Sequence, residues 1–361
     1  MRLLKILIAC VALLVLFPAF SIAAEEVVSK TKTDISFKLE VENAIGKGLT
    51  WLASKQNSGG WWSQEEHPAL TALVLTAFRG EPSGFYKKKY EQTINKGYDY
   101  LLKNVKPDGS IYGKDVYINY NTAVCMTAFL VANRPEYENI IRKARNYLIG
   151  SQHDEGEKGM GDSPYDGGIG YGRTDKNPDL SNTVLALEAI YYTRYLKSET
   201  GKDYEAKDLN WNAAIQFISR IQHMRGYNDQ KWVSDDSYNK GGFVYFPGNS
   251  RAGEMTLSDG RVALRSYGSM SYAGLLSYIY AQLDKDDPRV KAVYDWLVRN
   301  YTLKENPGMG KSGLYYYYHT MAKALTAYGV DVLVLKGETK VNWREALAKR
   351  LLDLQKAEGF W

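Results

Sequence analysis

The sequence predicts an all-α fold in which helix pairs build a double-walled ring, an (α/α)6-type toroid, and three observations predict it. An amphipathic segment carrying a doublet of large apolar residues recurs along the chain. A second segment, apolar on every side, follows most copies, and glycine or proline marks the turns between them. Alternation of one-sided and fully apolar helices is typical of two concentric helical layers, with the amphipathic layer outside.

The amphipathic segments form the predicted outer wall. Their doublets are Trp51-Leu52, Tyr100-Leu101, Tyr147-Leu148, Phe217-Ile218, Trp296-Leu297 and Leu351-Leu352. In the first segment Ile45, Leu49 and Leu52 are spaced as one face of a helix, which leaves the other face to water. Turns after these segments contain Gly59-Gly60, Pro107-Asp108-Gly109, Gly156 or Pro307-Gly308, residues that end helices.

The apolar segments form the predicted inner wall. They cover 69–78, 122–132, 183–190 and 270–283, and a fifth begins within the four tyrosines at 315–318. Since each outer helix is expected to run antiparallel to its inner partner, the inner helices share one direction and start at one rim of the ring. The run 242–246 is expected to form a small hairpin inside an insertion.

The given sequence stops after the sixth outer segment, at Trp361. No sixth apolar segment follows, so the sequence predicts that the ring is open. Three explanations stay open at this point: an open ring, a gap filled by a protein partner or by self-association, or a truncated product. An exposed apolar seam at the gap would favour association.

The first 24 residues have the features of a secretory signal peptide. Arg2 and Lys5 precede a continuous apolar stretch, and Ala23-Ala24 offers a small-residue cleavage site. We therefore expect an exported protein, periplasmic or extracellular, in which residues 25–361 form a single toroid domain. A lipoprotein-like box ending at Cys10 is the minority interpretation, because that box lies inside the apolar stretch.

Charge, cysteine content and motifs exclude several classes of function. The net charge of +5 is mild and dispersed, so the sequence predicts no binding to DNA or other nucleic acid. Cys125 is the only cysteine after the predicted signal peptide, so stability must rest on packing and not on internal disulfides. No phosphate-binding loop is present, and we expect no cofactor. The 29 tyrosines suit either a cavity wall that is partly exposed to water or an aromatic core.

Two stretches of sequence resemble the Gln-Trp repeat of squalene and oxidosqualene cyclases. The first has Gln56, Gly60 and Trp62, and the second has Gln355, Gly359 and Trp361 at the same spacing. The chain therefore resembles the squalene-cyclase and prenyltransferase superfamily, the terpene cyclase/mutase-like proteins, over nearly all of its expected mature length. This resemblance implies a toroid around a central apolar cavity that binds or processes an isoprenoid or other apolar ligand.

The cyclase resemblance implies a proton-initiated mechanism, in which an aspartic acid protonates an alkene and aromatic faces stabilise the cation. The matching motif begins at Asp179, with Ser181 and Asn182 where the family has two further acids. The family's catalytic acid falls on Ser181, so the usual acid motif is not retained. Asp179 is the remaining candidate for a catalytic group, and a helix N-cap is its structural alternative.

The prenyltransferase resemblance implies a zinc site built from Asp, Cys and His. It places the histidine at His319, whereas the matching segment 265–269 contains neither Asp nor Cys. Zinc needs three or four protein ligands. We therefore expect no metal, and His319 is interpreted as a hydrogen-bonding residue at the cavity rim, with a catalytic role as the alternative.

The shared direction of the inner helices gives the remaining candidates for ligand binding. Five polar or aromatic residues stand near the starts of predicted inner helices: His67, Asn121, Ser181, Asn182 and Tyr318. A polar mouth over an aromatic interior is typical of a small-molecule site. Caps and loop contacts are the alternative role for most of these residues.

Two classes of function follow from these observations. The first is an enzyme acting on an isoprenoid, either a terpene cyclase/mutase-like isomerase or a prenyltransferase-like protein. The second is a non-catalytic scaffold that binds a lipid or a protein, which the replaced acid motif and the missing zinc ligands favour. A carbohydrate-active toroid is a third, weaker option, for which the paired carboxylates Asp235-Asp236 are the supporting feature.

Overall fold

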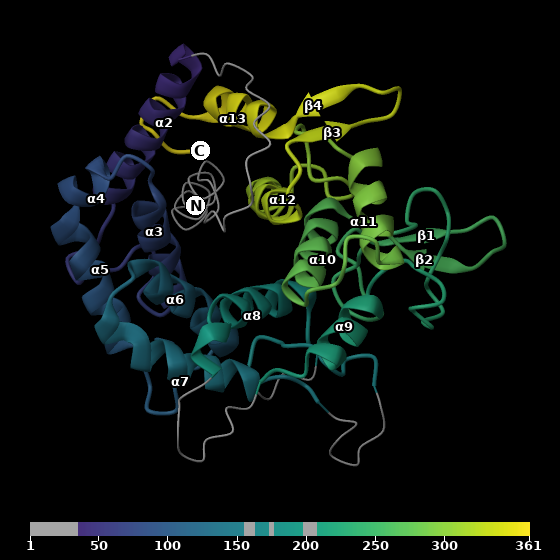
Figure 1. The fold of residues 1–361 in the computed structure, drawn as a ribbon, viewed down its shortest axis with the longest axis horizontal. Coiled ribbons are helices and arrows are strands. Elements are labelled where there is room, and N and C mark those ends of the chain that lie inside the picture. Colours follow the sequence, from purple (N-terminus) through teal and green to yellow (C-terminus); the bar gives the residue numbers. More distant parts are fainter. Residues whose placement is uncertain (1–34, 155–162, 173–176, 198–207) are drawn as a thin grey trace.

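A computed structural model describes residues 35–154, 163–172, 177–197 and 208–361. The predicted signal peptide and Cys10 lie outside these ranges. The described helices form a ring with two walls (Figure 1). The predicted all-α toroid is therefore confirmed.

The outer wall contains the six amphipathic segments that the sequence predicts. These are α2 (Ile35–Ala53), α5 (Glu91–Lys103), α7 (Glu138–Ile149), α9 (Trp211–Ser219), α11 (Pro288–Arg299) and α13 (Trp343–Leu354). Each buries one face; in α5, for example, Ile94, Tyr98 and Leu101 point into the core. The short helices α4 (Phe85–Lys89), η1 (Pro135–Tyr137) and η3 (Arg194–Lys197) lie in the connections.

The inner wall contains the five apolar segments. These are α3 (Pro68–Gly80), α6 (Ile118–Ala132), α8 (Leu180–Tyr192), α10 (Gly268–Tyr280) and α12 (Leu314–Tyr328). Consecutive inner helices pack side by side, and outer helices cover them from behind (Figure 1). Burial follows the sequence pattern, since every residue of α10 except Ile279 is buried. An all-round apolar helix is stable only when it is covered on every side.

Four glutamines each tie the turn after an outer helix to the next outer helix, and we call these contacts the glutamine clasps. They belong to Gln56, Gln152, Gln222 and Gln355, whose side-chain amides each donate two hydrogen bonds. One bond goes to a glycine carbonyl of the same turn: Gly60, Gly167, Gly241 or Gly359. The other goes to a carbonyl at the following outer helix: Thr93, Asn210, Arg289 or Ala44.

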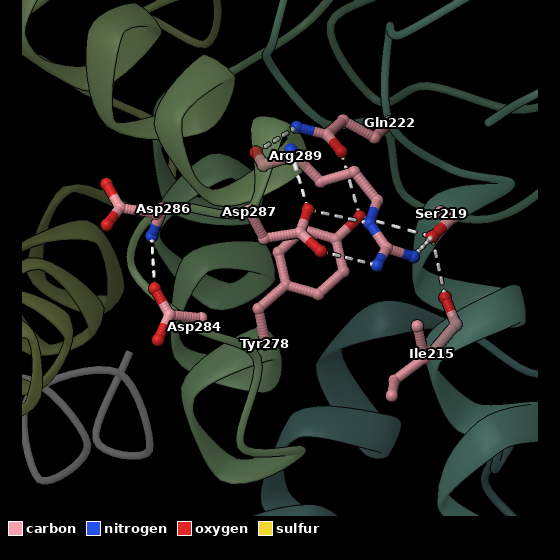
Figure 2. A network of polar contacts seen from close by, with 8 residues as sticks. All are labelled: Ile215, Ser219, Gln222, Tyr278, Asp284, Asp286, Asp287 and Arg289. Carbon is pink, nitrogen blue, oxygen red and sulfur yellow. Dashed lines mark hydrogen bonds and ion pairs between the residues drawn. The ribbon is translucent and has the colours of Figure 1, made fainter. Parts of the chain in front are cut away.

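The Gln222 clasp lies in a wider polar network (Figure 2). The Tyr278 hydroxyl of α10 donates to Gln222 Oε1 at 2.8 Å, so the clasp also holds the inner wall. Arg289 binds Asp287 through Nε and Nη2, at 2.9 and 2.7 Å, and donates to Ser219 Oγ at 3.2 Å. Asp287 in turn caps α11. The outer and inner walls are therefore joined by satisfied hydrogen bonds at this point.

The last clasp closes the outer wall onto its own beginning. Gln355 Nε2 donates to Ala44 O of α2 at 2.8 Å, and α13 packs beside α2 (Figure 1). The Trp361 indole donates to Leu351 O at 2.8 Å, as the Trp62 indole does to Leu52 O at 2.7 Å. The predicted opening is thus confined to the inner wall, where the described residues place no helix between α12 and α3.

Two short hairpins extend from the ring. Strand β1 (Glu254–Thr256) pairs with β2 (Val262–Leu264), and β3 (Val332–Val334) pairs with β4 (Lys340–Asn342), both antiparallel. The hairpin expected at 242–246 is not formed. Phe243 pairs only with Gln222, in an isolated bridge. Phe243 is fully buried and its N–H donates to Ser271 Oγ of α10, so this segment packs as core.

Candidate functional site

Asp179 lies at the start of α8 and acts as its N-cap. Its Oδ1 accepts hydrogen bonds from Asn182 N at 3.0 Å and Ser181 Oγ at 2.5 Å, and its Oδ2 accepts from Asn182 Nδ2 at 2.6 Å. Burial raises the pKa of Asp179, and hydrogen bonds from Ser181, Asn182 and Tyr245 oppose that rise. The carboxylate is therefore held by Ser181 and Asn182, which follow it in the same motif.

Five tyrosines interact electrostatically with this carboxylate or with one another, and we call them the tyrosine mouth: Tyr120, Tyr171, Tyr245, Tyr267 and Tyr316. The Tyr245 hydroxyl lies 3.5 Å from both Ser181 Oγ and the Tyr171 hydroxyl. Burial raises the pKa of Tyr316, and the charges of Asp179, Tyr245, Tyr120 and Tyr171 raise it further. Tyr267 caps α10 and is likewise buried, with its pKa raised mainly by burial.

Tyr316 is the member of the mouth with an unsatisfied polar group. Its hydroxyl is buried and has no hydrogen-bond partner among the described residues. A buried hydroxyl without a partner costs about 1–3 kcal/mol. Native structures keep few such groups, and each one requires a physical explanation.

A series of aromatic contacts extends from Tyr171 of the tyrosine mouth toward α3. The His67 ring lies 5.7 Å from the Tyr117 ring, which lies 5.0 Å from that of Tyr171. Tyr117 caps α6 in the left-handed region, with φ of 54°, and stays 50% exposed. A bulky residue rarely adopts this conformation, and such strain is common at ligand sites. The starts of α3, α6 and α8 are thus linked through aromatic side chains.

His319 stands one turn further along α12 from Tyr316. Its Nδ1 is buried without a described partner, and burial together with the Lys323 charge lowers its pKa well below the usual value. Lys323 forms an ion pair with Glu188 of α8. His319 is therefore neutral near pH 7. No group of three metal-ligating side chains is found within the described ranges.

Two of the predicted ligand-binding residues have other partners. Asn121 Oδ1 accepts from Ala69 N at 3.1 Å and its Nδ2 donates to Tyr117 O at 3.0 Å, so it joins the starts of α3 and α6. The Tyr318 hydroxyl donates to Leu303 O, beyond the outer helix α11. Neighbouring residues on a helix point in different directions. Tyr316 and not Tyr318 therefore faces the mouth.

Sequence reasoning missed Tyr171, Tyr245, Tyr267 and Tyr316 as members of this site. Tyr316 was within reach, because it precedes His319 by three residues and so shares its helix face. Tyr245 and Arg251 lie in the long connection before α10, and no sequence spacing indicates that it returns to α8. The contact that brings it there is Leu180 N donating to Tyr245 O at 3.0 Å.

Two hollows lie on the outer wall of the described part of the chain. One, of about 380 Å³, is lined by Tyr294, Asp295, Val298, Arg299 and Val334, between α11 and β3. The other, of about 300 Å³, lies between α2 and the α3–α4 turn and includes Leu39, Glu81 and Phe85. Neither is lined by a residue of the tyrosine mouth. Among the described helices, none is long and apolar enough to span a membrane.

Residues 69–246 match the family model of the squalene-hopene cyclase C-terminal domain. This segment runs from α3 to the connection that carries Tyr245, so it includes the Asp179 motif and most of the tyrosine mouth. The predicted resemblance to the squalene-cyclase and prenyltransferase superfamily is confirmed.

Three solved structures are similar to this chain at low identity. A protein from Actinoplanes is 13% identical with a TM-score of 0.43, and the match covers 90% of each chain. A type II terpene cyclase from Scytonema in its apo form is 11% identical with a TM-score of 0.42, covering 90% of this chain and 97% of that one. The same type of cyclase with its substrate, geranylgeranyl dihydroxybenzoate, is 11% identical with a TM-score of 0.39, covering 97% and 99%. At these values the likenesses do not decide what this chain binds.

Proposed function

We propose that this toroid binds an apolar ligand of isoprenoid or similar lipid character at the tyrosine mouth, and that it does not cyclise that ligand. The observation that carries the proposal is the buried Tyr316 hydroxyl, which lacks a partner beside Asp179 and four other tyrosines. A polar atom of a ligand would satisfy this hydroxyl, while the tyrosine rings offer apolar faces to a hydrocarbon chain.

The state of Asp179 argues against proton-initiated cyclisation. Both of its oxygens accept hydrogen bonds from Ser181 and Asn182, so the carboxylate is occupied in capping α8. The superfamily resemblance places the proton donor at Ser181, whose hydroxyl is far too weak an acid to protonate an alkene. His319 is kept neutral by its surroundings and supplies no alternative acid. Binding without chemistry is the function that remains.

Export is part of the proposal and rests on sequence alone. The charged start and the apolar stretch of residues 1–24 support it. Cell fractionation of the full chain, with a variant carrying Asp residues in the apolar stretch as control, tests it. Recovery of both proteins in the cytoplasm would contradict export and would leave the ligand proposal unaffected.

Ligand titration of the purified protein tests the binding proposal. We expect saturable binding of a linear isoprenoid alcohol such as farnesol, followed by calorimetry. Tyr316→Phe should weaken it about fivefold, because one hydrogen bond of about 1 kcal/mol is lost. Tyr195→Phe, which changes a 63% exposed tyrosine outside the mouth, is the matched control and should bind as the wild type does. Absence of saturable binding by the wild type, or equal binding by Tyr316→Phe, would refute the proposal.

A turnover assay tests the absence of catalysis. Neither the wild type nor Asp179→Asn should convert squalene, because the acid motif is replaced. Mass spectrometry of the extracted products gives the readout. Conversion by the wild type that disappears in Asp179→Asn would show that Asp179 is an active acid after all.

A further inference from the structure

The three exposed arginines of the connection before α10 fall into two groups. Arg225 Nε lies 3.0 Å from Asp235 Oδ2, and Arg261 Nε lies 2.8 Å from Asp259 Oδ2, so these two have carboxylate partners. Arg251 has none among the described residues, and its guanidinium instead lies 4.1 Å from the centre of the Tyr245 ring. The exposed arginine without an acid is thus the one beside the tyrosine mouth.

The surroundings of Arg251 are tyrosine side chains and helix starts. Burial alone would lower the pKa of Arg251, but Tyr245, Tyr267 and Tyr171 raise it, which places three mouth tyrosines close to its charge. Tyr245 O accepts from the first residue of α8, and Tyr267 is the N-cap of α10. Helix N-termini carry a partial positive charge. This side of the mouth therefore attracts anions.

The negative charge of Asp179 does not cancel this attraction. Its two oxygens are occupied by Ser181 and Asn182, and its burial raises its pKa. The Tyr245 hydroxyl lies 3.5 Å from Ser181 Oγ, which donates to Asp179, whereas the exposed Arg251 guanidinium lies over the Tyr245 ring. An anion arriving from solvent meets Arg251 first.

We propose, on the basis of the function proposed above, that the apolar ligand carries an anionic head group, a carboxylate or a phosphate, which Arg251 binds at the edge of the tyrosine mouth. A guanidinium presents paired donors that fit both anions. The tyrosine hydroxyls beside it are further donors for the same head group. The hydrocarbon part then lies along the tyrosine rings toward Tyr316.

The test compares three ligands with the same fifteen-carbon tail: farnesol, farnesoic acid and farnesyl monophosphate. They are titrated against the wild-type protein, Arg251→Gln and Arg261→Gln, the last being the matched control from the same connection. We expect the wild type to bind at least one anion about tenfold more tightly than the alcohol, since a charged hydrogen bond contributes more than 1.4 kcal/mol. Arg251→Gln should lose this advantage and keep its affinity for farnesol, whereas Arg261→Gln should keep both.

The outcomes separate this inference from the proposed function. If farnesol binds as tightly as both anions, or if Arg261→Gln loses the advantage as Arg251→Gln does, the head-group inference is overturned and apolar binding stands. If none of the three ligands saturates the wild type, the proposed function itself fails. Preference for the acid over the monophosphate identifies a carboxylate head group, and the reverse preference identifies a phosphate. A preference that shrinks with added salt supports the charge interaction.

Discussion

The clasp glutamines of the outer-wall turns and Tyr316 of the tyrosine mouth differ in how far their polar groups are hydrogen-bonded. In the turns, four clasp glutamines donate both of their amide hydrogens to carbonyls, and glycines fit tightly against the next helix. In the mouth, the hydroxyl of Tyr316 and Nδ1 of His319 stay buried without described partners. Fully satisfied contacts stabilise a fold, while buried unsatisfied groups reduce its stability unless a ligand compensates. The difference separates residues that hold the ring together from those available for binding.

The largest effect is expected where a clasp glycine touches the next helix. Gly241 has φ of +90°, and a Cβ there would lie 2.1 Å from Ala292 O. Gly241→Ala should lower the free energy of unfolding by about 3 kcal/mol, from the strained backbone and the collision together. Gly260→Ala is the control, since Gly260 has φ of +81° but open space around it, and should cost about 1 kcal/mol. Urea unfolding measures both, and equal losses would contradict a tight fit.

The next effect concerns the clasp that closes the outer wall. Gln355→Ala removes the donors to Ala44 O, at 2.8 Å, and Gly359 O, at 3.0 Å. We expect a loss of about 2 kcal/mol in the free energy of unfolding, with faster amide exchange in α2 and α13. Gln64→Ala, at an exposed position, should change neither. Unchanged exchange in both helices would show that this clasp does not hold the ring closed.

A pH effect of similar size is expected at the fourth turn. His223, which follows the clasp residue Gln222, has its pKa lowered by burial to about 4, and its Nδ1 accepts from Ser234 N at 3.0 Å. The unfolded state takes up a proton below about pH 6.5 and the folded state does not, so stability falls as pH drops from 6.5 toward 4. The loss at pH 5 should be about 2 kcal/mol. The midpoint temperature of thermal unfolding of His223→Gln should change less with pH over this range than that of the wild type. If both proteins show the same pH dependence, the effect comes from other groups, such as His319.

A smaller effect of opposite sign is expected in the mouth. Tyr316→Phe removes a buried hydroxyl without a partner, so it should raise the free energy of unfolding by about 1 kcal/mol. Tyr318→Phe, two residues away, removes a hydroxyl that donates to Leu303 O and should lower it by about as much. Differential scanning calorimetry of the two variants in the absence of ligand measures both. Destabilisation by Tyr316→Phe would show that its hydroxyl makes a stabilising contact, which would contradict the contrast drawn between the clasps and the mouth.

The smallest effect restores a clasp that the second turn lacks. Val105 stands four residues before Gly109, as Gln56 does before Gly60, and a Cβ on Gly109 would lie 2.3 Å from Lys143 O. By the spacing of the other clasps, Val105→Gln should donate to Ile140 O and stabilise the fold by about 1 kcal/mol. Val105→Ala controls for the lost valine and should destabilise instead. If Val105→Gln is no more stable than Val105→Ala, the geometry of the other clasps does not apply to the second turn.

The sequence by itself determined the helices, their order and their assignment to two walls. Periodicity of apolar residues records which face of a helix is buried, so α10 and α5 were distinguishable before any coordinates. The repeated spacing of Gln56 and Gln355 to a glycine is also visible in the sequence, and both glutamines form clasps in the structure. These features depend on residues close together in the chain, and local spacing is what a single sequence records.

Only the tertiary structure decided the closure of the outer wall and the composition of the mouth. Gln355 binds Ala44 across 311 positions of sequence, and Tyr245 reaches Ser181 across 64. Contacts at such separations depend on how the whole ring closes and leave no periodic signal in either segment. The choice of Tyr316 over Tyr318 likewise follows from the rotation of α12 in the ring, which its neighbour α10 fixes through packing.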